Sequence, residues 1–167
     1  MGWRKVGGYL LLALLILSVD FASKIYVHTH LPLMQAGEYP YDGIPVFQGI
    51  GGVDFAIVHV LNRGVAWGWL AGWQDYLPYL RLGIIAALAA YFVSSRVGRE
   101  QRGYLILIIA GALGNVIDYF LYHHVVDMFY FVCWGFSYPV FNVADSAIFC
   151  GIVGLILRPK KLVIVND

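Results

Sequence analysis

The chain has 167 residues, of which 60% are hydrophobic and only 13% charged, and its formal net charge is +1. A soluble protein carries about 25% charged residues, so this composition does not cover the surface of a soluble domain of this size. The near-neutral charge argues for neither a nucleic-acid nor an acidic partner, so no nucleic acid is expected to bind, and two cysteines, Cys133 and Cys150, are too few for a disulfide scaffold. The chain is therefore expected to be a single membrane domain.

Four segments are apolar enough to cross a bilayer, which takes about 20 residues in a helix. The first begins after the basic residues Arg4 and Lys5, but no small-residue cleavage site follows Leu17, so it is expected to be a retained helix and not a removed signal peptide. The four predicted spans are residues 7–27, 76–93, 103–120 and 138–157.

The basic residues predict the orientation of these spans. Eight of the eleven Lys and Arg residues fall on one side of a four-span topology, and this side is expected to be cytoplasmic, with both termini. These eight are Arg4, Lys5, Arg96, Arg99, Arg102, Arg158, Lys160 and Lys161.

Two connections then face outward. Residues 28–75 form the longer one, in which residues 53–61 (VDFAIVHVL) have the alternation typical of short strands. Trp67, Trp69 and Trp73 follow, and tryptophan favours the water–lipid interface. The second connection, residues 121–137, is shorter and rich in aromatic residues.

Charged residues inside membrane helices cost at least about 2.5 kcal/mol each, so each requires a reason. Asp20 and Lys24 are four residues apart and are expected to pair on one helix face, either to neutralise each other or to support a site. In the third and fourth spans, Asn and Asp recur three residues apart, which places each pair on a face toward the bundle. These pairs are Asn115 with Asp118 and Asn142 with Asp145, and Gly111, Gly114 and Ser146 lie on the same segments.

Asp127 lies nine residues after Asp118, and a continuous helix turning about 100° per residue would place the two on opposite faces. A break at His123–His124 is expected to return Asp127 over the bundle. If the fourth helix begins at Pro139, Asp145 lies roughly 9 Å inside it, near the outer surface. The sequence thus predicts that Asp127 and Asp145 meet there.

Two carboxyl groups in a poorly hydrated site share a proton, so one takes a proton from water while the other polarises a scissile carbonyl group. Paired acids in a membrane also serve proton or cation transport, and polar residues also hold structural helices together, so these alternatives stay open. A metal hydrolase is less favoured because the histidines form no HExxH motif. These histidines are His28, His30, His59, His123 and His124.

Several motifs together resemble the bacterial lipoprotein signal peptidases, or type II signal peptidases, over nearly the whole chain. They occur in the family's order on the four predicted spans and their connections. The matching motifs are Asp20-x-x-x-Lys24, NRGVAWG at 62–68, GALGNVID at 111–118, VVD at 125–127 and FNVADS at 141–146.

The resemblance implies an aspartic endopeptidase of the bacterial inner membrane that cuts prolipoproteins before a diacylglyceryl-modified cysteine, without metal or cofactor. It implies four transmembrane helices with a small extracytoplasmic β-cradle and a short interfacial helix, in contact with membrane lipids. Asp127 and Asp145 match the catalytic residues, while Asn62, Asn115, Asp118, Asn142, Asp20 and Lys24 match supporting positions.

The sequence departs from the family at two positions. Tyr119 stands where the family usually has Arg, and Trp67 stands where it usually has Phe. The missing Arg removes a partner of the substrate or of a carboxylate, and Arg63 is the candidate cation to replace it.

Overall fold

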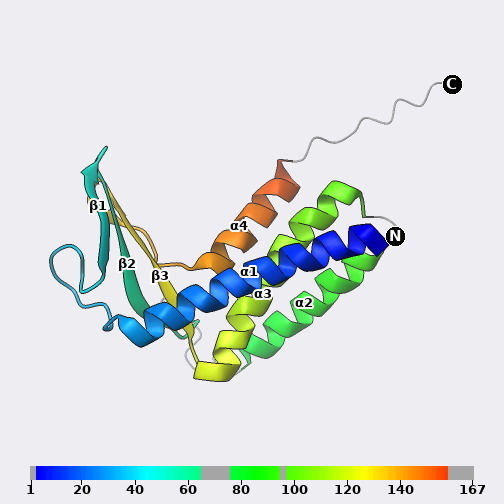
Figure 1. Cartoon of the computed structure of the whole chain (residues 1–167), viewed down its shortest axis with the longest axis horizontal. Coiled ribbons are helices and arrows are strands. Elements are labelled where there is room, and N and C mark those ends of the chain that lie inside the picture. Colours follow the sequence, from blue (N-terminus) through cyan, green and yellow to red (C-terminus); the bar gives the residue numbers. More distant parts are fainter. Residues whose placement is uncertain (1–2, 65–75, 95–96, 158–167) are drawn as a thin grey trace.

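The chain is described here by a computed structural model, which covers residues 3–64, 76–94 and 97–157. The described residues form four helices and one sheet (Figure 1). The helices are α1 (Trp3–His30), α2 (Leu77–Val93), α3 (Arg99–Tyr122) and α4 (Val143–Ile156).

Two of these helices are long and apolar enough to cross a membrane, Val6–His30 and Arg99–Tyr122. The other two are apolar but shorter, with 17 residues in α2 and 14 in α4. Each of the four overlaps a predicted span; α1 and α3 extend beyond their predicted ends, and α4 begins later than predicted. The fold is therefore a bundle of apolar helices, and the outer face of α1 leaves Leu10, Leu11 and Leu14 exposed.

The sheet has four antiparallel strands in the order β1-β2-β3-β4. They are β1 (Ile44–Ile50), β2 (Val53–Asn62), β3 (Val125–Cys133) and β4 (Phe136–Ser137). The predicted strand at residues 53–61 is confirmed as β2. Trp67, Trp69 and Trp73 fall outside the described residues, and the described part of this connection contains no interfacial helix.

The break between α3 and β3 is confirmed at His123, whose φ of 59° is left-handed and ends the helix. The chain then turns directly into β3, so Asp127 belongs to a strand and not to a loop. In the register of the sheet, Asp127 lies opposite Val60 and Val125 lies opposite Asn62. The sheet therefore carries both Asp127 and Asn62 to the end of the helix bundle.

The predicted start of the fourth helix at Pro139 is wrong. Residues up to Phe141 run extended beside β3, with mutual backbone hydrogen bonds between Phe129 and Phe141, and α4 begins at Val143. Asn142 is its N-cap, because its side chain accepts a hydrogen bond from the Asp145 amide at 2.8 Å. Asp145 consequently lies in the first turn of α4 and not two turns inside it.

Glycines allow α3 to approach its neighbours closely. A Cβ atom at Gly111 would meet the carbonyl oxygen of Ala144 on α4, and one at Gly114 would lie 2.6 Å from Asp20 Oδ2 on α1. The backbones of α1, α3 and α4 can therefore meet at the level of the polar residues.

Candidate active site

Asp127 is buried, with 1% of its surface exposed, although it belongs to a short sheet at the edge of the protein. Each of its carboxylate oxygens accepts a hydrogen bond from a side-chain amide. Asn62 Nδ2 lies 2.8 Å from Oδ2, and Asn142 Nδ2 lies 2.7 Å from Oδ1. Burial raises the pKa of Asp127 to about 7, and the charge of Asp145 acts in the same direction against the two amide hydrogen bonds.

Asp145 is fixed by the start of α4. Its Oδ2 accepts a hydrogen bond from the backbone amide of Asn142 at 3.3 Å, which completes a reciprocal capping box. Its Oδ1 accepts a second one from Asn115 Nδ2 at 2.7 Å. Unlike Asp127, Asp145 is only partly buried and lines a groove. The carboxyl group of Asp145 is thus accessible from the groove, whereas that of Asp127 is buried.

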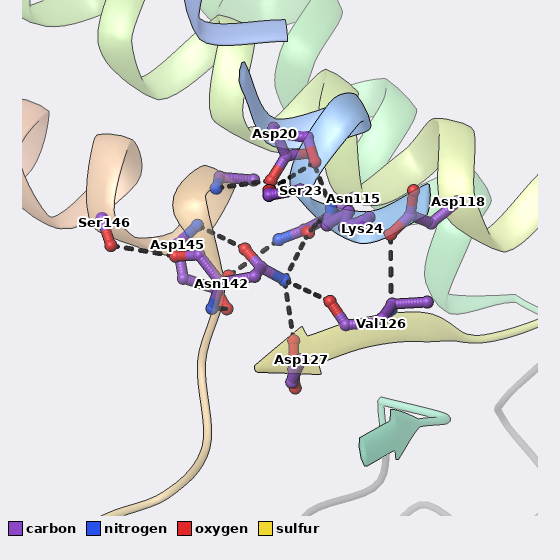
Figure 2. A network of polar contacts seen from close by, with 11 residues as sticks. Asp20, Ser23, Lys24, Asn115, Asp118, Val126, Asp127, Asn142, Asp145 and Ser146 are labelled. Atoms are coloured by element: carbon purple, nitrogen blue, oxygen red, sulfur yellow. Dashed lines mark hydrogen bonds and ion pairs between the residues drawn. The ribbon is translucent and has the colours of Figure 1, made fainter. Parts of the chain in front are cut away.

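Two asparagine amides connect the aspartates (Figure 2). Asn142 Nδ2 donates to Asp127 Oδ1 at 2.7 Å and to Asn115 Oδ1 at 3.1 Å, while Asn115 Nδ2 donates to Asp145 Oδ1. Asn115 lies on α3, Asn142 caps α4 and Asp127 belongs to β3. The network therefore brings α3, α4 and β3 to one point, and the predicted meeting of the two aspartates near this point is supported by the geometry.

Beneath this network, Lys24 is enclosed by oxygen atoms and is 1% exposed. Its Nζ lies 2.7 Å from Asp20 Oδ2, 2.8 Å from Asp118 Oδ2 and 3.0 Å from Asn115 Oδ1. The expected Asp20–Lys24 pair is present, and Asp118 joins it from α3. Three charges are thus buried together, which is tolerated because each one is paired and hydrogen-bonded.

The two carboxylates of this cluster also hold the backbone next to the site. Asp118 Oδ2 accepts a hydrogen bond from Val126 N at 3.3 Å, and Asp20 Oδ1 accepts one from Ala144 N at 2.8 Å. Val126 directly precedes Asp127, and Ala144 directly precedes Asp145. Side-chain spacing alone gave no sign of these backbone contacts, because they depend on how β3 and α4 meet the bundle.

Arg63 does not join the site. It is exposed, and within the described residues it forms no ion pair with either aspartate. It instead lines a small cavity that also includes Arg81 and Tyr119. Arg63 as a cation beside the carboxylates is therefore not supported by the structure.

Two other sequence features have hydrogen-bond partners other than the aspartates. Ser146 belongs to the polar side of α4, but its hydroxyl donates to the backbone oxygen of Asn142 at 2.9 Å. His28 and His59 contact each other, with ring nitrogens 3.4 Å apart. Within the described ranges, no three His, Cys, Asp or Glu side chains are grouped closely enough to hold a metal ion.

A groove of about 570 Å³ reaches Asp145 from the outside of the molecule. The wall of the groove is almost entirely apolar. The groove lies between β3 and α4. The lining comprises Phe131, Cys133, Tyr138, Pro139, Val140, Phe141, Asp145, Ser146, Phe149 and Cys150. The groove can therefore hold an apolar or extended ligand beside the carboxyl group of Asp145.

Known proteins share this fold. Two solved structures, each described as a bacterial membrane enzyme determined by the in meso method, superpose on the chain with TM-scores of 0.76 and 0.74. The first is 28% identical and covers 90% of this chain and 91% of its own. The second is 27% identical and covers 90% of this chain and 86% of its own.

The chain is also similar in sequence to curated proteins. A lipoprotein signal peptidase of Xylella fastidiosa is 37% identical over 88% of this chain and 84% of its own length. One of Burkholderia ambifaria is 46% identical over 61% of this chain, and that match spans 64% of the relative's length. The family model described as signal peptidase (SPase) II matches residues 12–159. The chain therefore belongs to the signal peptidase II family of membrane peptidases.

Proposed function

We propose that the chain is an aspartic endopeptidase that removes the signal peptide from prolipoproteins, cutting before a cysteine that carries a diacylglyceryl group. The observation that carries this proposal is the pair formed by buried Asp127 and groove-lining Asp145, joined through Asn142 and Asn115. The apolar groove that Asp145 lines suits a lipid-bearing substrate. No metal or cofactor is needed for this chemistry, since two carboxyl groups and water supply every proton transfer.

In the proposed reaction the scissile carbonyl group lies between the two carboxyl groups. Asp145, which the groove reaches, takes a proton from water as the water oxygen attacks the carbonyl carbon. Asp127, whose pKa lies at about 7, gives its proton to the carbonyl oxygen. When the tetrahedral intermediate collapses, Asp145 returns its proton to the leaving amine and Asp127 regains one from the hydroxyl group, so that both carboxyl groups return to their starting states.

The remaining polar residues are assigned to positioning. Asn62 and Asn142 use their amide groups to orient Asp127, and Asn115 orients Asp145. Asp20, Lys24 and Asp118 fix the backbone beside both aspartates. These residues hold the carboxyl groups in place before substrate arrives, which avoids reorganisation during the reaction.

The proposal places all four helices across the bacterial inner membrane, as one domain with both termini cytoplasmic and lipids around the bundle. At about 1.5 Å per residue, α2 is roughly 25 Å long and α4 roughly 21 Å, somewhat less than a bilayer core of about 30 Å. Basic Arg99 and Arg102 lie in the first turn of α3. The hydroxyl group of Tyr9, near the start of α1, donates a hydrogen bond to the backbone oxygen of Arg99, so the two helix starts lie at the same end of the bundle. The aspartates then lie near the extracytoplasmic face.

The test is cleavage of a diacylglyceryl-modified prolipopeptide by purified enzyme in lipid. Asp127→Asn and Asp145→Asn each preserve size and remove the acid, and each is expected to lower the rate by at least about 1000-fold. Asp42→Asn is the matched control, because Asp42 is exposed and its φ of 60° also suits asparagine. Full activity of either site variant overturns the two-aspartate mechanism, and equal cleavage of an unmodified peptide overturns the lipid specificity. Ion transport in proteoliposomes without cleavage would favour a transporter.

A further inference from the structure

Three of the five histidines of the chain lie close together, although they are far apart in the sequence. His28 belongs to the last turn of α1, His59 belongs to β2, and His124 lies between α3 and β3. The ring centroids of His28 and His59 are 5.3 Å apart, and those of His28 and His124 are 6.0 Å apart. These three residues, here named the histidine cluster, lie where the end of α1 meets the sheet (Figure 1).

The backbone fixes the tautomer of His59. Its Nδ1 lies 3.0 Å from the carbonyl oxygen of Leu31. A carbonyl oxygen can only accept a hydrogen bond, so Nδ1 carries the proton and Nε2 presents a lone pair. Histidines that bind metal ions are commonly oriented in this way, with the second ring nitrogen donating to a backbone carbonyl group. The lone pair of His59 is therefore directed before any ligand binds.

This lone pair faces a nitrogen atom of His28. His28 Nδ1 lies 3.4 Å from His59 Nε2. A hydrogen bond from an N–H group is usually about 2.7–3.2 Å long, so the contact is a poor hydrogen bond. Two zinc–nitrogen bonds of about 2.05 Å at a tetrahedral angle instead place their nitrogen atoms roughly 3.3 Å apart. The spacing of the two nitrogen atoms thus fits one shared metal ion.

The surroundings of this pair are suited to a cation. His59 is 5% exposed and His28 is partly exposed, so the pair is reached from the side of His28. Burial lowers the pKa of His124, and the neighbouring His28 and Arg63 act in the same direction, so this ring is neutral at neutral pH and does not repel a cation. Its Nε2 is buried without a hydrogen-bond partner among the described residues. Neutral imidazole groups are favoured ligands of Zn²⁺, Cu²⁺ and Ni²⁺.

We propose that His28 Nδ1 and His59 Nε2 together bind one transition-metal ion such as Zn²⁺, with water at its remaining coordination positions. His28 then carries its proton on Nε2, so both rings stay neutral. The metal ion joins the last turn of α1 to β2, three residues before Asn62, and holds the sheet against the helix bundle. It takes no part in the proton transfers of Asp127 and Asp145, so the inference does not depend on the proposed peptidase activity.

The test measures Zn²⁺ binding by calorimetry at neutral pH. The full chain is purified without a polyhistidine tag, because such a tag would bind the same ion. The unsubstituted protein is expected to bind one Zn²⁺ per chain and no Mg²⁺, which prefers oxygen ligands. His28→Gln and His59→Gln are each expected to weaken Zn²⁺ binding at least tenfold, since the loss of an outer partner of a metal ligand already costs about 10–100-fold.

Two variants serve as controls. His30→Gln removes another histidine from the end of α1, but His30 is exposed and its Nδ1 lies 3.1 Å from Tyr26 O. Asp127→Asn removes a carboxyl group of the proposed active site. Both variants are expected to bind Zn²⁺ as the unsubstituted protein does. A loss of binding in Asp127→Asn would place the metal ion at the aspartates and overturn the histidine site.

A second measurement identifies the ligands directly. The electron paramagnetic resonance spectrum of bound Cu²⁺ is expected to show coupling to imidazole nitrogen atoms, and this coupling is expected to weaken in His28→Gln. Zn²⁺ is expected to raise the unfolding temperature of the unsubstituted protein but not that of His28→Gln. His28 is only partly buried, so this variant decides the test even if His59→Gln does not fold. Unchanged Zn²⁺ binding in His28→Gln, or no binding by the unsubstituted protein, overturns the proposal.

Discussion

Asn142 donates a hydrogen bond of 2.7 Å to Asp127 while its own side-chain oxygen caps the helix that carries Asp145. One side chain therefore fixes the start of α4 and the orientation of a carboxyl group on β3. It is fully buried, so water does not replace either contact when the side chain is changed. This double role makes the two contributions of Asn142 separable by the choice of substitution.

Asn142→Ser is expected to keep the helix cap, because serine is a good N-cap residue, and to lose the amide that reaches Asp127. Asn142→Ala loses both, and the missing cap adds about 1 kcal/mol of destabilisation. Prolipopeptide cleavage is expected to fall at least about 100-fold in both variants, whereas thermal unfolding separates them. Equal stability of the two variants would show that the cap contributes nothing.

Much of this site is predictable from the sequence, since paired Asn and Asp residues three apart must turn away from lipid. The predicted pairing of Asp20 with Lys24 and the break at His123 also follow from local rules. The strand β3 and the start of α4 at Val143 do not. Apolar residues 138–142 fit a helix by composition, and only their pairing beside β3, a contact distant in sequence, holds them extended.

The strand was missed for a related physical reason. VVDMFYFVC is nearly uniformly apolar, so it lacks the alternation that marks a half-buried strand, and its pairing partner β2 lies more than 60 residues earlier. The roles of Val126 and Ala144 are likewise invisible, because any residue offers the same backbone amide. Residue type predicts which groups need partners, and tertiary packing decides which partners they find.

Lys24→Met is expected to destabilise the protein by about 3–5 kcal/mol, because it leaves two carboxylates buried without a cation. Adding Asp20→Asn and Asp118→Asn removes these charges and is expected to recover part of the lost unfolding temperature. Recovery of stability without recovery of cleavage would fit positioning roles for Asp20 and Asp118. If Lys24→Met unfolds at the temperature of the unsubstituted chain, the buried ion cluster does not contribute to stability.

The pH dependence of stability is expected to report on Asp127. Its pKa is raised from 3.8 to about 7, so the folded state holds a proton that the unfolded state releases. The stability linked to this group is therefore fully present below about pH 3.8 and is lost as the pH rises to about 7. Asp127→Asn is expected to remove this pH-dependent loss of stability. At pH 8 the variant should therefore be more stable than the unsubstituted chain, although it is inactive.

Cleavage should follow the same titration if Asp127 donates a proton. The rate constant kcat/KM is expected to fall about tenfold for each pH unit above about 7, where the free enzyme loses the proton of Asp127. The measurement is a pH profile of prolipopeptide cleavage in lipid, with unfolding followed in parallel to separate inactivation from titration. A rate that stays constant from pH 7 to 9 would contradict the assignment of Asp127 as the acid.

Gly111→Ala tests whether close helix approach positions the site. The added Cβ would meet the carbonyl oxygen of Ala144 and lie 2.9 Å from Ile148 Cγ1, so α4 must move away from α3. Such overpacking costs about 1–3 kcal/mol, and the same movement displaces Asp145 from Asn115. We expect a lower unfolding temperature together with a loss of cleavage larger than the loss of folded protein.

Gly83→Ala is the matched control, because Gly83 lies within α2 and a Cβ atom there meets nothing within 4 Å. Alanine favours a helix over glycine by about 1 kcal/mol, so this variant should be as stable as the unsubstituted chain or more so, with unchanged cleavage. The contrast between the two substitutions isolates the contact with Ala144 from helix propensity. If both variants behave alike, the spacing of α3 and α4 does not control the geometry of Asp145.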